Sequence, residues 1–192
     1  MRIILASASP RRRELLNQLG LEFEVIVSDV EEVITKTLPA EVVEELSYIK
    51  AKDVFDKTQG DVLVIGSDTV VAYENRILGK PRDMEDAKET LSLLSGNSHF
   101  VYTGVTLFKR ECGEVTHKTF HEATRVEFYP MSREEIEWYV ASGECSDKAG
   151  SYAIQGIGNT LVDHYEGSLE NIIGLPIEEV KNVLGEIYGM EN

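Results

Sequence analysis

The chain has 192 residues, of which 19 are Lys or Arg and 34 are Asp or Glu, giving a formal net charge of −15 at pH 7. Proteins that bind long nucleic acids or anionic membranes gain affinity from positive surfaces, so both classes of partner are disfavoured. A hydrophobic content of 42% and a charged content of 28% are ordinary for an ordered globular protein. We expect a single domain over residues 1–192.

The cysteine content and the N-terminal sequence indicate a cytoplasmic protein. Cys112 and Cys145 are too few for a disulfide framework, although one bridge between them stays open. The start MRIILASASPRRR places its cluster of arginines after the apolar stretch, which is the reverse of a secretory signal. No apolar run approaches the roughly 20 residues that a membrane helix needs. We therefore expect no membrane partner and a small ligand.

The apolar pattern alternates between strand and helix spacing along the chain. Ser9, Asp83 and Ser132 are placed to cap three of the helices, the last with a capping-box Glu three residues on. The predicted elements, in chain order, are a strand at 2–6, a helix at 10–20, a strand at 23–27, a helix at 39–60, strands at 62–66, 70–73 and 77–78, a helix at 83–96, strands at 99–109 and 115–129 joined by a hairpin, a helix at 132–142, a strand at 160–165 and a helix at 176–187. Because helices alternate with strands and hairpins, the sequence predicts an α/β fold with a mixed sheet.

The first candidate site is the turn from the first strand into the first helix, with the sequence Ser7-Ala8-Ser9-Pro10-Arg11-Arg12-Arg13. Backbone N–H groups and the positive end of the helix dipole at such a turn bind anions. Arginines in the first turn of a helix are disfavoured by the dipole. A bound phosphate would pair with both the arginines and the free backbone N–H groups. The alternative is a solvated basic patch on a surface helix.

The second candidate site is Asp68, which interrupts a buried-type strand within Gly66–Thr69. A carboxylate in that position is partly desolvated, and it suits a general base or a metal ligand. The alternative is an Asp that caps a bend in the chain.

Two further segments carry weaker signals. Lys80 lies on a turn stiffened by Pro81 and suits an oxygen-rich ligand, although an exposed lysine is commonly without function. The glycine-rich stretch at 150–158 permits the close approach of a ligand, and its Gln155 can read a base edge. This stretch is not a dinucleotide-binding motif, because the third glycine and the following helix are absent. The weakest candidates, on helix faces and in loops that are usually solvated, are Lys50, Lys52, Glu31 and Glu32.

Other kinds of site lack support in the sequence. The chain has no Walker-type phosphate loop. Its cysteines and histidines do not have the spacing of zinc ligands. None of its histidines lies near a nucleophilic serine motif, so a hydrolase triad is also disfavoured.

Six segments, in order along the chain, resemble the Maf family of nucleoside triphosphate pyrophosphatases, also called septum-formation proteins. They are LASASPRR (5–12), GSDTVV (66–71), GKPRD (79–83), YTGV (102–105), DKAGSYAIQG (147–156) and the stretch from EGS to GLP (166–176). Any one of these segments alone would be a weak signal. Six ordered segments that span almost the whole chain make a specific match.

The resemblance implies a fold and an activity. The fold is α/β, with an elongated, twisted mixed sheet and helices that form two lobes around a cleft, like that of inosine triphosphatases. The implied activity is a house-cleaning one, the hydrolysis of the bond between the α- and β-phosphates of a nucleoside triphosphate to the monophosphate and pyrophosphate. The implied cofactor is a divalent cation, Mg2+ or Mn2+, which prefers oxygen ligands.

The resemblance also implies catalytic and phosphate-binding residues. Asp68 matches the general base that activates water and is also a metal contact. Glu32 matches a second acidic position at the metal, although Glu31 beside it leaves the choice open. The phosphate-contacting positions are matched by Ser7, Arg12, Lys50 and Lys80.

The resemblance implies that three further positions set base specificity: Arg11, Thr69 and Gln155. The combination of Thr69 with Gln155 is similar to the branch of the family that acts on dTTP and UTP, whereas the branch for N7-methyl-GTP has Gln and Glu at these two positions. Two alternatives stay open: N7-methyl-GTP or another modified nucleotide as the substrate, and a nucleotide-binding regulator of cell division with little turnover. The resemblance is compatible with a homodimer.

Overall fold

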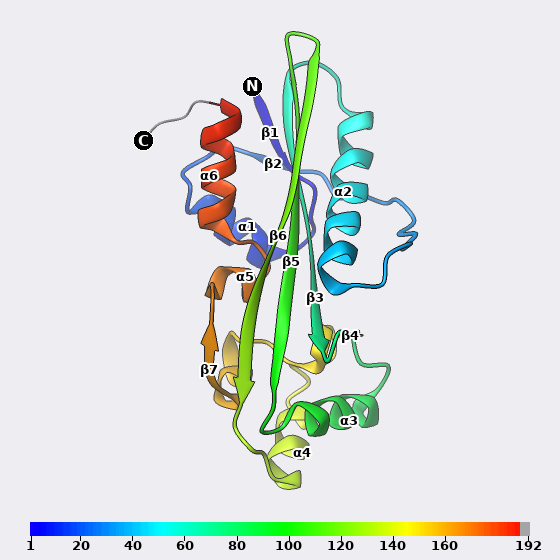
Figure 1. Ribbon diagram of the computed structural model, residues 1–192, viewed down its shortest axis with the longest axis vertical. Coiled ribbons are helices and arrows are strands. Elements are labelled where there is room, and N and C mark those ends of the chain that lie inside the picture. Colours follow the sequence, from blue (N-terminus) through cyan, green and yellow to red (C-terminus); the bar gives the residue numbers. More distant parts are fainter. Residues whose placement is uncertain (189–192) are drawn as a thin grey trace. The chain divides into compact units, whose positions relative to one another are not determined.

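The computed structural model describes residues 1–188, and it has the expected α/β fold with a mixed sheet (Figure 1). The strands are β1 (Arg2–Leu5), β2 (Glu24–Val25), β3 (Val62–Tyr73), β4 (Arg76–Leu78), β5 (Ser98–Glu111), β6 (Glu114–Phe128) and β7 (Val162–Glu166). The helices are α1 (Pro10–Asn17), α2 (Pro39–Lys57), α3 (Met84–Leu94), α4 (Arg133–Ala141), α5 (Leu169–Ile173) and α6 (Ile177–Tyr188). Ser9, Asp83 and Ser132 cap α1, α3 and α4 as predicted.

The sheet has the strand order β2-β1-β3-β5-β6-β7, with β4 paired to β3. β1 runs parallel to both of its neighbours, β2 and β3, whereas β4 is antiparallel to β3 and β7 is antiparallel to β6. The β5–β6 hairpin turns at Cys112 and Gly113, both of which have the positive φ that a tight two-residue turn requires. These pairings confirm the prediction of a mixed sheet.

The predicted elements differ from the structure in four places, apart from small shifts at their ends. The strands predicted at 62–66 and 70–73 form one continuous strand, β3, so Asp68 does not interrupt the strand and does not cap a bend. The strand expected at 23–27 is reduced to Glu24–Val25, and Val25 and Val27 are exposed, because β2 is an edge strand that pairs only with β1. β7 begins at Val162, two residues later than predicted, because residues 156–161 form a 3₁₀ helix. The short helix α5 was not predicted, although Ser168 caps it by accepting a hydrogen bond from the backbone N–H of Asn171.

The chain folds as two compact units. The first consists of Met1–Asp68, Thr103–Glu122 and Gly174–Asn192, within the limits of the described residues. The second consists of Thr69–Tyr102 and Ala123–Ile173.

The core of the first unit lies between α2 and the strands β1, β3 and β5. Its buried residues are Ile4, Ala6, Ala51, Val54, Phe55, Val62, Val64 and Phe108. Because side chains alternate along a strand, Leu5, Leu63 and Ile65 point to the opposite face, where they are also fully buried. Figure 1 shows α6 on the side of these strands opposite to α2, so both faces of the sheet are covered in this unit.

Two strand glycines allow α2 to lie very close to the sheet. A Cβ atom at Gly104 would lie 2.2 Å from the carbonyl oxygen of Val43, and one at Gly66 would lie 2.6 Å from that of Ser47. Both obstructing atoms belong to the helix backbone, which cannot rotate out of the way. α2 therefore rests directly on the backbone of β3 and β5, and this fixes where its side chains meet the strands.

The core of the second unit is built from α3, α4 and strand residues of β3 to β6, and it contains a buried histidine, His99. The strand residues are Val71, Leu78, Val101, Val126 and Phe128. His99 Nε2 lies 2.8 Å from the hydroxyl oxygen of Tyr152, and the two rings meet edge to face, with Phe128 against both. His99 Nδ1 has no hydrogen-bond partner among the described residues. Burial lowers the pKa of His99 from 6.5 to about 4.

Acidification is expected to destabilise the fold through His99. Between pH 6.5 and 4 the unfolded chain binds a proton at this residue, whereas the folded chain holds it neutral. The free energy of unfolding should therefore fall by roughly 3 kcal/mol from pH 7 to pH 4 on this account. Urea unfolding of the wild-type protein and of His99→Gln at both pH values measures the effect. The variant should lose less stability, because the carboxylates that also titrate are common to both proteins; parallel losses would refute the role of His99.

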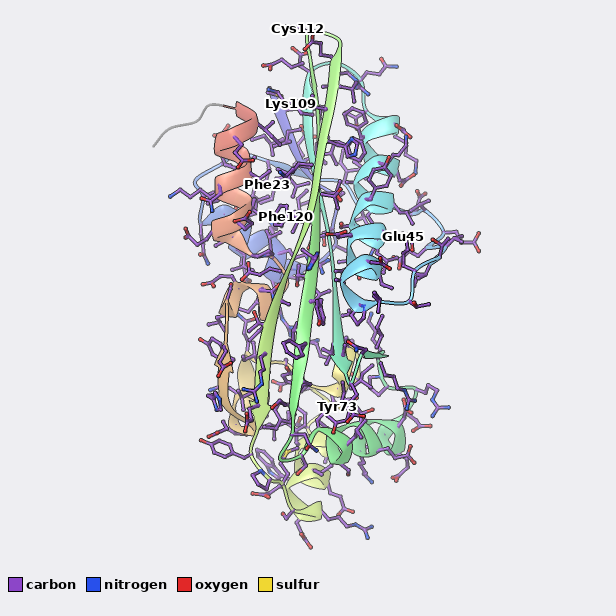
Figure 2. The ribbon with its side chains drawn as sticks, in the orientation of Figure 1. Phe23, Glu45, Tyr73, Lys109, Cys112 and Phe120 are labelled. Carbon is purple, nitrogen blue, oxygen red and sulfur yellow. The ribbon has the colours of Figure 1, made fainter. Side chains whose placement is uncertain are left out.

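Both cysteines are free, so the bridge that the sequence left open is absent. Cys112 is exposed at the tip of the hairpin (Figure 2), and Cys145 is buried in the core of the second unit. In the part of the chain that the structure describes, no helix has both the length and the apolar character to cross a membrane.

Candidate active site

The turn between β1 and α1 forms one wall of a polar cluster in the first unit. Ser7 is buried two residues after the end of β1, and its hydroxyl accepts a hydrogen bond from the backbone N–H of Ser9. The Ser9 hydroxyl in turn accepts one from the backbone N–H of Arg12, with Pro10 as the first residue of the helix. This local capping sets the direction in which the arginines leave the helix.

Hydrogen bonds to two main-chain carbonyls and to Ser7 help to fix Arg12. Its Nε donates to the carbonyl oxygen of Gly174 (2.8 Å), and its Nη1 donates to the carbonyl oxygen of Ser67 (2.9 Å) and to the hydroxyl of Ser7 (3.3 Å). Burial lowers the pKa of Arg12, and the negative charge of Asp68 partly offsets this effect. The guanidinium remains charged at neutral pH, because an arginine side chain in a protein is effectively always protonated. Arg12 is thus held in one orientation, whereas Arg13 of the same segment is exposed.

Lys50 joins the two candidate acids. Its Nζ lies 2.5 Å from Asp68 Oδ1 and 3.0 Å from Glu32 Oε1. The side chains of Lys50 and Asp68 are only 19% and 15% exposed, so this ion pair is shielded from solvent. The close packing of α2 against Gly66 brings Lys50 to Asp68, because Ala51, the neighbour of Lys50, lies against that glycine. Glu32, rather than Glu31, is the loop acid that contacts Lys50.

The loop that carries Glu32 is bound to α2 on both sides of this contact. Before it, the hydroxyl of Ser28 donates to the carboxylate of Asp53 (2.8 Å). After it, both the backbone N–H and the hydroxyl of Thr35 donate to the carboxylate of Glu45 (2.8 and 2.5 Å). Figure 2 shows Glu45 on the side of α2 that faces this loop. The placement of Glu32 therefore depends on acids that lie along one helix.

The carboxylates of Asp68 and Glu32 offer only oxygen donors. Within the described residues, no group of three or more His, Cys, Asp or Glu side chains is arranged to hold a metal ion. Mg2+ is commonly bound by one or two carboxylates together with waters and substrate phosphates, so this pair fits an ion that arrives with a phosphorylated ligand. Lys50 contacts both carboxylates in the structure.

Three of the other predicted site residues lie in the second unit, and Arg11 lies on α1 next to Arg12. Thr69 follows Asp68 in β3 and is the first residue of the second unit. Lys80 and Gln155 belong to the same unit, and both are exposed. The turn before Lys80 is joined to the glycine-rich segment by a hydrogen bond from the backbone N–H of Gly150 to the carbonyl oxygen of Gly79 (3.1 Å). Arg11 is half-buried on α1.

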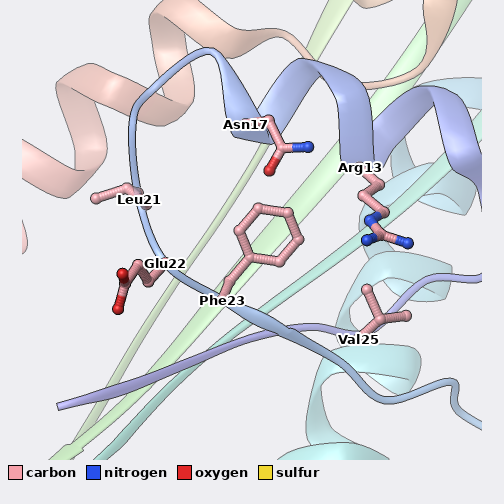
Figure 3. A pocket seen from close by; sticks show the side chains of 6 residues that line it. All are labelled: Arg13, Asn17, Leu21, Glu22, Phe23 and Val25. Carbon is pink, nitrogen blue, oxygen red and sulfur yellow. The ribbon is translucent and has the colours of Figure 1, made fainter.

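Arg13 lines a different hollow of the first unit. Together with Asn17, Phe23 and other residues it surrounds a surface pocket of about 440 Å³ (Figure 3). Apart from Arg13 itself, no residue of the predicted sites lines this pocket. Arg13 also lies just outside the first segment of the family resemblance, which ends at Arg12.

Two residues of the cluster were not predicted. Ser67 and Gly174 supply the carbonyl oxygens that hold Arg12, and the Ser67 hydroxyl also donates to the carbonyl of Gly174 (3.0 Å). Both lie in segments that carried the family resemblance. Their part in the site rests on main-chain atoms, however, which a reading of side-chain types does not reveal.

A cluster of oriented cations beside a carboxylate pair, on an α/β fold, is typical of a protein that acts on a phosphorylated ligand. The sequence matches the Maf family, described as Maf-like protein, over residues 2–187. The chain therefore belongs to the Maf family.

Relatives of high similarity have one shared description. A dTTP/UTP pyrophosphatase of Lachnoclostridium phytofermentans is 49% identical over 184 residues, which cover 93% of each chain. One from Agathobacter rectalis is 48% identical over 198 residues, covering 96% of this chain and 97% of the relative. One from Bacillus thuringiensis subsp. konkukian is 48% identical over 93% of this chain and 92% of the relative. Among solved structures, that of a HAM1 protein from Coxiella burnetii aligns with a TM-score of 0.49 and 20% identity over 97% of this chain and 99% of that chain.

Proposed function

We propose that this chain is a nucleotide pyrophosphatase that hydrolyses dTTP and UTP between the α- and β-phosphates, releasing the monophosphate and pyrophosphate. The observation that carries the proposal is the near-half identity to dTTP/UTP pyrophosphatases over more than 90% of both chains. The cluster in the first unit supports it, because it combines the cations and the carboxylates that such a hydrolysis requires. The proposed substrates are free nucleotides in the cytoplasm.

The cluster offers three functions to a bound triphosphate. Arg12 is held with its charge oriented, and together with Lys50 it would neutralise phosphate oxygens before water attacks. Asp68 would accept the proton of the attacking water, since it is shielded from solvent and belongs to a strand rather than a mobile loop. Ser7 orients Arg12 and offers a hydroxyl to a phosphate.

A divalent cation fits the pair Asp68 and Glu32, as their oxygen donors indicate. When bound, such an ion supplies Lewis-acid polarisation and further neutralisation of the phosphates. Because Lys50 already contacts both acids, it would keep the two carboxylates close together before substrate arrives.

Base recognition is proposed for Thr69 and Gln155, with Arg11 as a third contact and Lys80 as a phosphate contact. The Watson–Crick edge of thymine or uracil has two carbonyl acceptors and one N–H donor. A Gln side-chain amide can pair with an acceptor and the donor at once. A Glu in that place would instead suit the donors of a guanine edge.

Pyrophosphate release from a panel of nucleotides tests the proposed function. The panel contains dTTP, UTP, dCTP, dATP and N7-methyl-GTP, each with Mg2+ or Mn2+ and with EDTA as the metal-free control. We expect the highest kcat/KM for dTTP and UTP, and loss of activity in EDTA. Binding of dTTP without release of pyrophosphate would contradict the proposal and favour a nucleotide-binding regulator. A higher kcat/KM for N7-methyl-GTP would contradict the proposed substrate.

The double substitution Thr69→Gln with Gln155→Glu should change the choice of base. The acidic side chain no longer offers the N–H donor that a thymine carbonyl requires, so kcat/KM for dTTP should fall by about 10- to 100-fold relative to N7-methyl-GTP. Competition between the two nucleotides in one reaction measures the ratio directly. An unchanged ratio would remove these two residues from base recognition.

A further inference from the structure

The segment that carries Gln155 is held by one carboxylate, that of Glu144 in the turn after α4. Glu144 Oε1 accepts a hydrogen bond from the backbone N–H of Ile157 (3.0 Å), and its Oε2 accepts one from the backbone N–H of Gly158 (2.8 Å). Oε2 also accepts a hydrogen bond from the hydroxyl of Tyr139 (2.9 Å). A single side chain thus pairs with two successive backbone donors that lie thirteen and fourteen residues further along the chain.

These two donors belong to the start of the 3₁₀ helix Gly156–Leu161, for which Gln155 is the N-cap residue. The side chain at an N-cap usually accepts hydrogen bonds from the first free N–H groups of the helix. Gln155 makes no such cap bond, because Glu144 takes these N–H groups instead. The Gln155 amide is consequently not used for capping, and it lies exposed at the surface of the second unit.

The contact between Glu144 and the 3₁₀ helix leaves little room for other backbone conformations around Gln155. Gly156 has a positive φ of +83°, and a Cβ atom there would lie 2.1 Å from Glu144 Oε1. On the other side of Gln155, the hydroxyl of Tyr139 accepts a hydrogen bond from the backbone N–H of Ala153 (3.3 Å). The backbone is therefore held both before and after Gln155, by Tyr139 and by Glu144.

We propose that Glu144 is a positioning residue for base recognition: by capping the 3₁₀ helix in place of Gln155, it fixes the backbone from which Gln155 reads the base and leaves the amide available to do so. The inference rests on the proposed function, since Gln155 acts as a reader only if the chain selects pyrimidine triphosphates. Glu144 does not touch the substrate in this scheme; it acts through Gln155.

The variant Glu144→Gln tests the proposal, because it retains size but replaces one acceptor oxygen by an NH2 donor. One backbone N–H is then left facing a donor. We expect the kcat/KM ratio of dTTP to dCTP to fall roughly tenfold, mainly through a higher KM for dTTP. Amide hydrogen exchange at Ile157 and Gly158 should become at least about tenfold faster. Tyr139→Phe should produce a smaller change in the same direction, and it replaces Glu144→Gln if that variant does not fold.

Glu137→Gln is the matched control. It makes the same chemical change in the same unit, but at an acid that is paired with Arg133 on the exposed side of α4, and it should leave the substrate ratio unchanged. If Glu144→Gln speeds amide exchange but keeps the wild-type ratio, Glu144 is only structural and the inference is overturned. If the wild-type protein itself releases no pyrophosphate from dTTP, the proposed function is overturned, and the inference with it.

Discussion

Asp68→Asn is expected to lower kcat for pyrophosphate release from dTTP by about 10²- to 10⁴-fold, the usual contribution of a general base. The amide has nearly the shape of the carboxylate, but it cannot accept a proton from water. The fold should tolerate the change, because Lys50 keeps its second ion pair with Glu32. Steady-state kinetics with dTTP measure the loss, and thermal unfolding checks that the variant is folded.

Asp56→Asn provides the control for this substitution. Asp56 also pairs with a lysine of α2, Lys52, at 2.6 Å, but both of these side chains are about half exposed. An exposed pair of this kind contributes about 0.5 kcal/mol to stability, and we expect wild-type kcat for Asp56→Asn. If Asp68→Asn keeps its activity within a few-fold of the wild-type protein, Asp68 is not the base.

Gly104→Ala is expected to reduce both stability and activity. The added Cβ would lie 2.2 Å from the carbonyl oxygen and 2.3 Å from the carbonyl carbon of Val43, so α2 must move away from β5. Such overpacking against backbone should cost about 3 kcal/mol of the free energy of unfolding. Because α2 carries Lys50, kcat/KM for dTTP should fall as well, even under conditions where the variant is fully folded. Urea unfolding and kinetics at low temperature separate the two effects.

Gly79→Ala distinguishes this packing effect from a general sensitivity to glycine replacement. The φ of Gly79 is not in the positive range, and nothing lies within 4 Å of an added Cβ. Its free energy of unfolding should stay within about 0.5 kcal/mol of the wild-type value. If Gly104→Ala and Gly79→Ala destabilise the protein equally, the close packing of α2 against β5 is not the cause of the destabilisation.

The elements that were predicted correctly are those specified by local interactions. The helices begin at Ser9, Asp83 and Ser132 because a side chain at each position accepts hydrogen bonds from the next turn, a property that can be read from a few neighbouring residues. The strand predicted at 23–27 failed because its apolar alternation has nothing to face. Val25 and Val27 are exposed on the short edge strand and just after it, and a sequence does not indicate which strand is at the edge.

The sequence indicated which residues belong to the candidate site, but not which of them contact one another. The resemblance supplied Arg12, Lys50 and Asp68 as separate residues, and the sequence left open whether Glu31 or Glu32 accompanies them. The contact of Lys50 with Asp68 depends on the packing of α2 against Gly66, and the orientation of Arg12 depends on the carbonyl oxygens of Ser67 and Gly174; both are long-range contacts. The role of Glu144 was not foreseen for the same reason, since its partners are backbone N–H groups more than ten residues away.

The charge balance of the cluster has a consequence for how fast a nucleotide arrives. Arg12 and Lys50 carry two positive charges, and Asp68 and Glu32 carry two negative ones, so these four side chains together are neutral. At long range these four side chains therefore add nothing to the field of a body with a net charge of −15. Electrostatics should retard association rather than steer it, and added salt should raise kcat/KM at low ionic strength by screening the repulsion. An enzyme of this kind would gain, not lose, catalytic efficiency in a saline medium.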